Sequence, residues 1–128
     1  MPGSRDVEIV NITKNVVVGT RIRVADKAFA RLVGLLGTNS LEPGGGLLIE
    51  PSSGIHTFGM SFPIDVVSLD AKMRVLGTWE NLGSWRFAAV HWRTRRVLEL
   101  PVGTIRTSRI EVSDQLCFNR AGFACCDT

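Results

Sequence analysis

Two acidic residues lie in strand-like stretches at positions where the alternation of side chains favours apolar residues. Asp65 shares a face with Val67 within residues 64–69. Glu99 shares a face with Val97 in a second apolar run. A buried carboxylate without a partner is energetically costly, so each acid must lie at a strand end, be paired or be hydrogen-bonded. Such carboxyl groups can have raised pKa values and act in acid–base chemistry, but structural ion pairs are common at such positions, and we favour a structural role.

A histidine adds a second kind of chemistry. His56 lies in a short strand-like stretch, residues 55–58, and its pKa range would suit a general base or a metal ligand. A lone histidine is more often a hydrogen-bonding residue at the edge of the core, which is the interpretation that we favour. The sequence has no G-x-S-x-G nucleophile elbow, and the glycines at 44–46 lack the lysine and hydroxyl of a phosphate-binding loop.

Cysteine usage gives no metal site and no obvious cross-link. The three cysteines form an odd number, no C-x-x-C spacing occurs, and both histidines are distant in sequence. We therefore predict no metal and no cofactor. A disulfide framework is not expected, and Cys117 is interpreted as a small core residue of a late strand.

The elements that must position these residues are mainly strands. Period-two patterns or apolar runs predict strands near 7–12, 16–18, 20–24, 47–49, 64–69, 73–79, 95–100 and 115–119, with a loop at 43–46 and an irregular segment at 80–94. Asp26 can cap a helix that ends at Gly37, and its apolar face carries Phe29 and Leu36. Arg31 lies on the opposite side of that helix, so periodicity predicts it to be exposed.

Composition and length indicate one globular domain. The chain has 128 residues, of which 45% are hydrophobic and 21% are charged. We expect a single domain over 1–128 with less ordered termini, of the α+β class and mostly β. The sheet should curl into a small barrel or sandwich, with one early helix and a short helical turn near 104–109. There is no apolar leader or span of ~18 apolar residues, so a soluble, cytoplasmic protein is expected by default, unless a leader was removed.

One region is rich in arginine and aromatic residues. Arginine with interleaved aromatic residues can bind single-stranded nucleic acid by charge and stacking. The formal net charge is only +3, however, so we favour a solvated loop in which arginine stems cover aromatic surface, and we expect no nucleic-acid partner. The residues are Trp85, Arg86, Phe87, His91, Trp92, Arg93, Arg95 and Arg96.

Several of these stretches together resemble an uncharacterised prokaryotic family, domain of unknown function 192. The resemblance spans roughly residues 20–118, and it implies a small strand-rich α+β domain but no activity. Arg31, His56, Met60, Asp65 and Glu99 fall at motif positions, while Gly59 departs from the bulky residue that relatives often have. The matching stretches are residues 31–36, 46–49, 56–67, 69–70, 97–103 and 110–116, the last with its acid at Asp114.

Three functional hypotheses follow. The first is a binding module with a polar pocket, floored by Met60 and Phe62, for a small anionic or hydroxyl-bearing ligand. The second is a protein-interaction or structural domain with a tryptophan-rich surface. The third is a hydrolase-like enzyme that uses a carboxylate and His56 in acid–base chemistry. We rank them in that order. The predicted lining of the pocket is Arg31, His56, Met60, Asp65 and Glu99.

Overall fold

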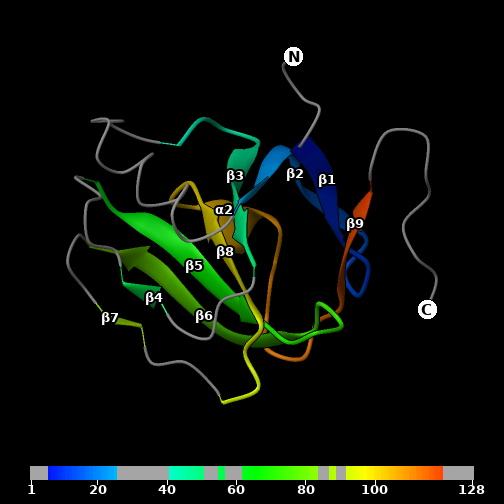
Figure 1. The fold of residues 1–128 in the computed structure, drawn as a ribbon. Coiled ribbons are helices and arrows are strands. Elements are labelled where there is room, and N and C mark those ends of the chain that lie inside the picture. Colours follow the sequence, from blue (N-terminus) through cyan, green and yellow to red (C-terminus); the bar gives the residue numbers. More distant parts are fainter. Residues whose placement is uncertain are drawn as a thin grey trace.

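The fold is built on one curled, seven-stranded sheet. The computed structural model describes residues 6–25, 41–50, 62–83 and 92–119, and the backbone of 55–56 and 87–88. The strand order is β6-β5-β8-β3-β2-β1-β9, and all neighbours are antiparallel except the parallel pair β2 and β3 (Figure 1). The strands are β1 (Asp6–Asn11), β2 (Val16–Ala25), β3 (Gly45–Ile49), β5 (Ile64–Leu69), β6 (Val75–Leu82), β8 (Arg96–Leu100) and β9 (Leu116–Asn119).

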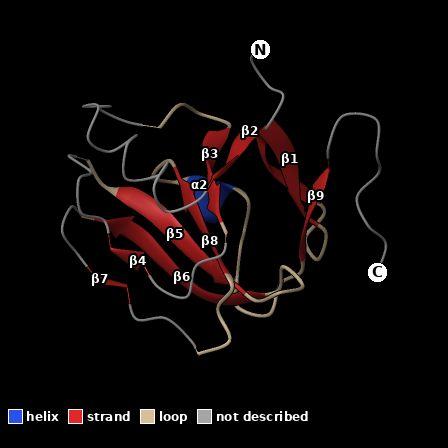
Figure 2. Cartoon of the chain, in the orientation of Figure 1, coloured by secondary structure: helices blue, strands red, loops and turns tan. Residues whose placement is uncertain are grey.

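Two small elements complete the described fold. β4 (Ile55–His56) and β7 (Phe87–Ala88) form a separate antiparallel pair. One short helix, α2 (Thr104–Thr107), follows β8, so the described chain is almost entirely strand and loop (Figure 2). Within the ranges that the structure describes, no helix has the length and apolar character needed to cross a membrane.

Burial follows the sequence pattern of each strand. β1 alternates buried and half-buried residues, as expected for a strand with one face in the core. β5 is buried at every position because it lies between β6 and β8 and both of its faces are covered. This explains why residues 64–69 are almost continuously apolar, and why the polar residues among them are informative.

The two edge strands meet at one end of the sheet. Arg74 and Gln115 form an isolated antiparallel bridge next to the starts of β6 and β9. The amide of Val75 donates to the carbonyl of Asp114 at 2.9 Å, and the amide of Leu116 donates to the carbonyl of Met73 at 3.0 Å. These bonds satisfy backbone groups that an open edge would expose, so the sheet curls into a half-barrel.

The sheet has two buried faces. The inner face, defined as the one that packs on α2, carries the larger core cluster, which includes Leu48, Leu98 and Ile105. The outer face, defined as the opposite one, carries a second cluster in which Val66 and Val97 are fully buried. Because neighbouring residues of a strand point to opposite faces, each polar residue in β5 and β8 can be assigned to one of these two environments.

The predicted class, mostly β with a curled sheet, is confirmed. Every predicted strand of the main sheet is present, with shifted ends; the predicted strands at 16–18 and 20–24 are one continuous β2. Two details of the prediction were wrong. Residues 80–94 are not wholly irregular, because β6 continues to Leu82 and β7 follows it. Gly45 and Gly46 begin β3 and do not belong to the preceding loop. The predicted helix after Asp26 lies outside the described residues.

Cys117 is a buried residue of β9, as expected, but it is also disulfide-bonded, which the sequence did not predict. The sequence offers two partners, Cys125 and Cys126, both beyond the described residues. A disulfide joins two of the three cysteines, so denatured protein without reductant should titrate with one reactive thiol per chain, and with three after reduction. Three reactive thiols before reduction would show that the cross-link is absent.

Candidate functional site

Glu99 lies in the middle of the outer face. Its strand, β8, runs between β3 and β5, and Glu99 is opposite Leu47 on one side and Val66 on the other. Only 3% of the residue is exposed. The neighbouring outer-face residue on β8 is Val97, which is fully buried. The carboxyl group is therefore surrounded by apolar side chains from three strands.

Within the described part of the chain, one oxygen of the Glu99 carboxyl group lacks the interactions that normally stabilise a buried charge. Among the described residues, nothing donates a hydrogen bond to its Oε1 atom, and no salt bridge reaches it. Burial raises the pKa of Glu99 from 4.5 to about 7. At neutral pH the group is thus divided between its protonated and ionised forms, which is the condition in which a carboxyl group can both donate and accept hydrogen bonds.

Ser68 is a second polar group on the same face. It is fully buried in β5, and its Oγ atom has no hydrogen-bond partner in the described part of the chain. Ser68 pairs with Val97 and Glu99 pairs with Val66, so the two polar residues are diagonal neighbours on adjacent strands. Side chains at diagonal positions lie about 7 Å apart at Cβ. Sequence reasoning missed Ser68, although it interrupts the same apolar run as Asp65.

A glycine on the neighbouring strand β6 allows an aromatic ring to pack beside the Ser68 hydroxyl. A Cβ atom at Gly77 of β6 would stand 3.2 Å from Ser68 Oγ and 2.8 Å from the ring of Trp79. The Trp79 ring therefore lies across Gly77, next to the Ser68 hydroxyl, and forms an aromatic wall of the site.

Asp65 has a different environment from Glu99. It points to the inner face, is fully buried, and both of its oxygens accept bonds from backbone amides. Oδ1 accepts from Asn81 at 2.9 Å, and Oδ2 accepts from Gly103 and Ile105, each at 3.0 Å. The carboxylate thus joins the end of β6 to the first turn of α2, where unpaired helix amides and a helix dipole favour an anion.

The sheet therefore separates the two acids that the sequence grouped into one pocket, since Asp65 faces inwards and Glu99 faces outwards. Arg31 and Met60 lie outside the described residues, and for His56 only the backbone, in β4, is described. Phe62 is buried and packs in the outer-face cluster with Val66 and Val97. The described part of the chain thus supports a site built on Glu99, Ser68 and the apolar residues around them.

A shallow hollow of about 280 Å³ lies elsewhere, beside α2. Its charged residues are engaged with one another. Lys14 Nζ donates to Glu111 at 2.8 Å and to Asp114 at 2.9 Å, and Arg106 lies 3.7 Å from Glu80. Burial alone would raise the pKa of Asp114, but bonds from Asn11, Lys14 and the Glu111 amide together lower it. These contacts tie β1 to the segment before β9, so the hollow belongs to a structural network.

The fold and site define a small β-rich domain with a buried carboxyl group on one face of a curled sheet, whose Oε1 atom has no partner among the described residues. Comparison with known proteins identifies the family. The model of domain of unknown function 192, described as "Uncharacterized ACR", matches residues 8–118, and this chain belongs to that family. No activity is attached to the family by that description.

Curated relatives and solved structures agree with this assignment. The UPF0127 protein of Thermococcus sibiricus is 31% identical over 84% of this chain and 72% of its own length. The UPF0127 protein of Pyrococcus horikoshii is 32% identical over 84% of this chain and 96% of its own length. A crystal structure of a protein of unknown function from Novosphingobium aromaticivorans is 18% identical, with a TM-score of 0.69 over 87% of this chain and 82% of that chain, and it supports the fold alone.

Proposed function

We propose that this protein is a ligand-binding domain whose site is centred on Glu99 on the outer face of the sheet. One observation carries the proposal: two buried polar groups on adjacent strands, Glu99 Oε1 and Ser68 Oγ, have no hydrogen-bond partner among the described residues. A buried polar group without a partner destabilises the fold by about 1–3 kcal/mol. A bound molecule that supplies the missing partners would offset that cost.

The chemistry of these groups favours a small hydroxyl-bearing ligand. Glu99 can accept a bond from a ligand hydroxyl when ionised, and can donate one when protonated, because its pKa is about 7. Ser68 can donate or accept, and the Trp79 ring offers a flat apolar surface. Arg31, His56 and Met60 stay predicted members of the site. Arg31 would extend the ligand class to anions, because its guanidinium fork binds carboxylates.

A thermal-shift screen with sugars, polyols and small carboxylates tests the proposal. A ligand at a hundredfold excess over its dissociation constant stabilises the native state by about 2.7 kcal/mol, so the melting temperature should rise by several degrees. Ser68→Ala and Glu99→Gln should each reduce the ligand-induced shift. Glu42→Gln is the matched control, because the Glu42 side chain is 77% exposed, and it should keep the full shift.

Two results would contradict this function. If no compound in the panel raises the melting temperature, the two unpaired groups do not form a site for this class of ligand. If a compound raises it equally in the parent, Ser68→Ala and Glu99→Gln, the protein binds that compound somewhere else.

Catalysis ranks below binding. A carboxyl pKa near 7 would suit a general acid or base. Acid–base catalysis also needs a reacting group within hydrogen-bond reach, and the raised pKa of Glu99 is caused by burial, with no contribution from a second titratable side chain among the described residues. A hydrolase function therefore depends on His56, whose side chain lies outside the described residues.

The expected cytoplasmic location stays a prediction. The disulfide at Cys117 weighs against it, because disulfides persist in oxidising compartments and are rare in the cytosol.

A further inference from the structure

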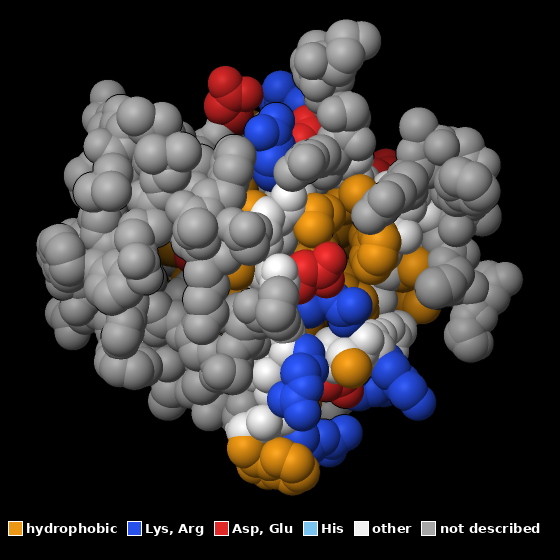
Figure 3. All heavy atoms as spheres, in the orientation of Figure 1, with side chains coloured by type: hydrophobic (Ala, Val, Ile, Leu, Met, Phe, Trp, Pro, Cys, Tyr) orange, Lys and Arg blue, Asp and Glu red, His pale blue; other side chains and the backbone are white. Residues whose placement is uncertain are grey.

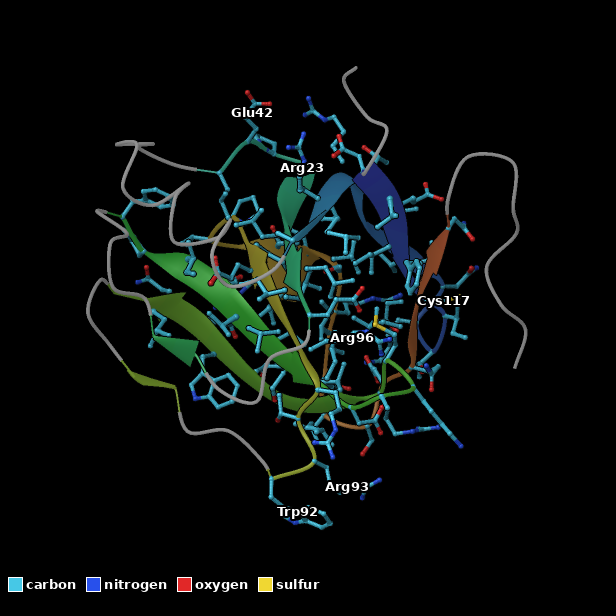
Figure 4. All side chains as sticks on the ribbon, in the orientation of Figure 1. Arg23, Glu42, Trp92, Arg93, Arg96 and Cys117 are labelled. Atoms are coloured by element: carbon cyan, nitrogen blue, oxygen red, sulfur yellow. The ribbon has the colours of Figure 1, made fainter. Side chains whose placement is uncertain are left out.

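A second candidate site lies at one end of the sheet. Its side chains are cationic and aromatic, whereas the outer-face site is built on a carboxyl group and a hydroxyl group. The turn between β5 and β6 and the loop before β8 meet there, and together they carry four basic residues and one exposed tryptophan. We call this the arginine–tryptophan corner. Figure 3 shows basic side chains gathered at this end, and Figure 4 shows Trp92 and Arg93 at its tip. The corner consists of Lys72, Arg74, Trp92, Arg93 and Arg95.

Specific contacts hold the two segments together around Asp70. The amides of Lys72 and Arg74 donate to Asp70 Oδ1 at 2.8 and 2.9 Å. The Arg93 guanidinium lies 4.0 Å from Asp70 Oδ2, and the amide of Arg95 donates to the carbonyl of Leu69 at 2.8 Å. The corner is therefore formed by the fold, because residues 72–74 and 92–95 are distant in sequence.

Positive charge is concentrated at this corner. Arg96 lies beside it, with its guanidinium on the carbonyls of Asp70 and Ala71 and on Glu50. Counting Arg96, five cations stand against the two carboxylates Asp70 and Glu50. The resulting excess of three positive charges equals the formal net charge of the whole protein. The formal charges of all other residues therefore sum to zero, and the positive charge of this corner would attract an anionic partner.

Two of the arginines are held in place without being neutralised. Arg74 Nη1 donates to the carbonyl of Ser113 at 3.0 Å, and Arg95 Nη1 donates to the carbonyl of Thr94 at 3.1 Å. In the part of the chain that the structure describes, no salt bridge involves Lys72, Arg74 or Arg95. Their remaining N–H groups can bind the oxygens of a phosphodiester, and a fixed guanidinium fork loses little entropy when it does so.

Trp92 supplies an aromatic surface among these charges. The residue is 80% exposed, so most of its indole ring faces solvent. Figure 4 shows its side chain directed away from the body of the molecule. An exposed indole ring can stack on an unpaired base, which contributes to binding regardless of sequence.

We propose that the arginine–tryptophan corner binds single-stranded nucleic acid, with phosphates on Arg74, Arg95 and Lys72 and one base stacked on Trp92. Paired bases of a duplex do not offer a face for such stacking, and the corner has no element that fits a groove. An anionic membrane would also be attracted by the charge, but the diffuse attraction of a bilayer does not require guanidinium groups fixed by carbonyls. This site is independent of the proposed ligand site at Glu99.

Fluorescence anisotropy with a labelled single-stranded oligonucleotide of about ten nucleotides tests the proposal on the full chain. Between about 50 and 200 mM salt, the logarithm of the binding constant should fall with the logarithm of the salt concentration, with a slope of about −2 for the three phosphate contacts at Arg74, Arg95 and Lys72. The double variant Arg74→Gln/Arg95→Gln should reduce that slope to about one third, because only the Lys72 contact remains. Trp92→Ala should weaken binding about tenfold with little change in the slope.

A control variant with the same loss of charge separates a site from general attraction. Arg21→Gln/Arg106→Gln removes two exposed arginines elsewhere, with side chains 57% and 83% exposed, and should bind within about twofold of the parent. Equal weakening in both double variants would overturn the proposal, as would the absence of binding at about 50 mM salt. Trp92-dependent binding to phosphatidylserine vesicles without binding to the oligonucleotide would overturn it in favour of a lipid surface.

Discussion

Glu99→Gln is expected to stabilise the folded protein by about 3 kcal/mol at pH 8 and to leave its stability almost unchanged at pH 4. The folded pKa of Glu99 is about 7, against 4.5 for an unburied glutamate. Above pH 7 the parent must keep an ionised carboxylate in an apolar environment, which costs about 1.4 kcal/mol for each unit of pKa difference. Below pH 4.5 the group is protonated in both states and the cost disappears.

The direction of the pH dependence follows from proton binding. Between pH 4.5 and 7 the folded state binds the Glu99 proton more tightly than the unfolded state, so its contribution to stability falls as pH rises. Other groups titrate in this range, so the informative quantity is the difference between the parent and Glu99→Gln. Urea unfolding at several pH values measures it, with Glu42→Gln as the exposed control. A difference that does not grow between pH 5 and 8 would contradict the assignment of Glu99 as a buried, unpaired acid.

Asp65→Ala is expected to destabilise the protein by about 3 kcal/mol or more. The substitution removes the acceptor for three amides, of which the bond from Ile105 is buried and the bonds from Asn81 and Gly103 are partly buried. Each unsatisfied buried donor costs about 1–3 kcal/mol, partly offset by relaxation and by entry of water. Denaturant unfolding measures the total loss, and Glu42→Ala serves as the exposed control.

Hydrogen exchange distinguishes this cause from a general loosening of the core. In Asp65→Ala the amides of Asn81, Gly103 and Ile105 should lose more protection than the fall in global stability explains. Amides that pair β1 with β2 should lose no more protection than that fall. A melting temperature within a degree of the parent would contradict the structural role of Asp65.

The two acids illustrate how one residue type acquires opposite roles. Asp65 accepts three amide bonds and joins β5 to β6 and to α2, so its removal should be costly. Glu99 accepts no bond at Oε1 within the described residues, so its conversion to a neutral amide should be favourable. A residue that reduces stability without a local structural reason is a better candidate for function than one that holds elements together.

The sequence determined the class of fold and which acids would be unusual. Apolar runs and period-two alternation predicted the strands of the main sheet, because side-chain burial follows a strand's own pleat. The same local rule identified Asp65 and Glu99 as acids in apolar strands. The resemblance of the central motifs to the family was also readable from the chain alone, and the family model confirms it over residues 8–118.

Only the tertiary structure decided what those residues do. Alternation shows which residues of one strand share a face, but it does not show which face of the neighbouring strand lies on the same side of the sheet. The sequence alone therefore could not show that Asp65 and Glu99 lie on opposite faces. The partners of Asp65 are amides 16 to 40 residues away, at the end of β6 and the start of α2. Likewise, Lys72 and Arg74 join Trp92 and Arg95 only because the turn after β5 packs beside the loop before β8. These roles depend on contacts between distant segments, and local patterns carry no information about such contacts.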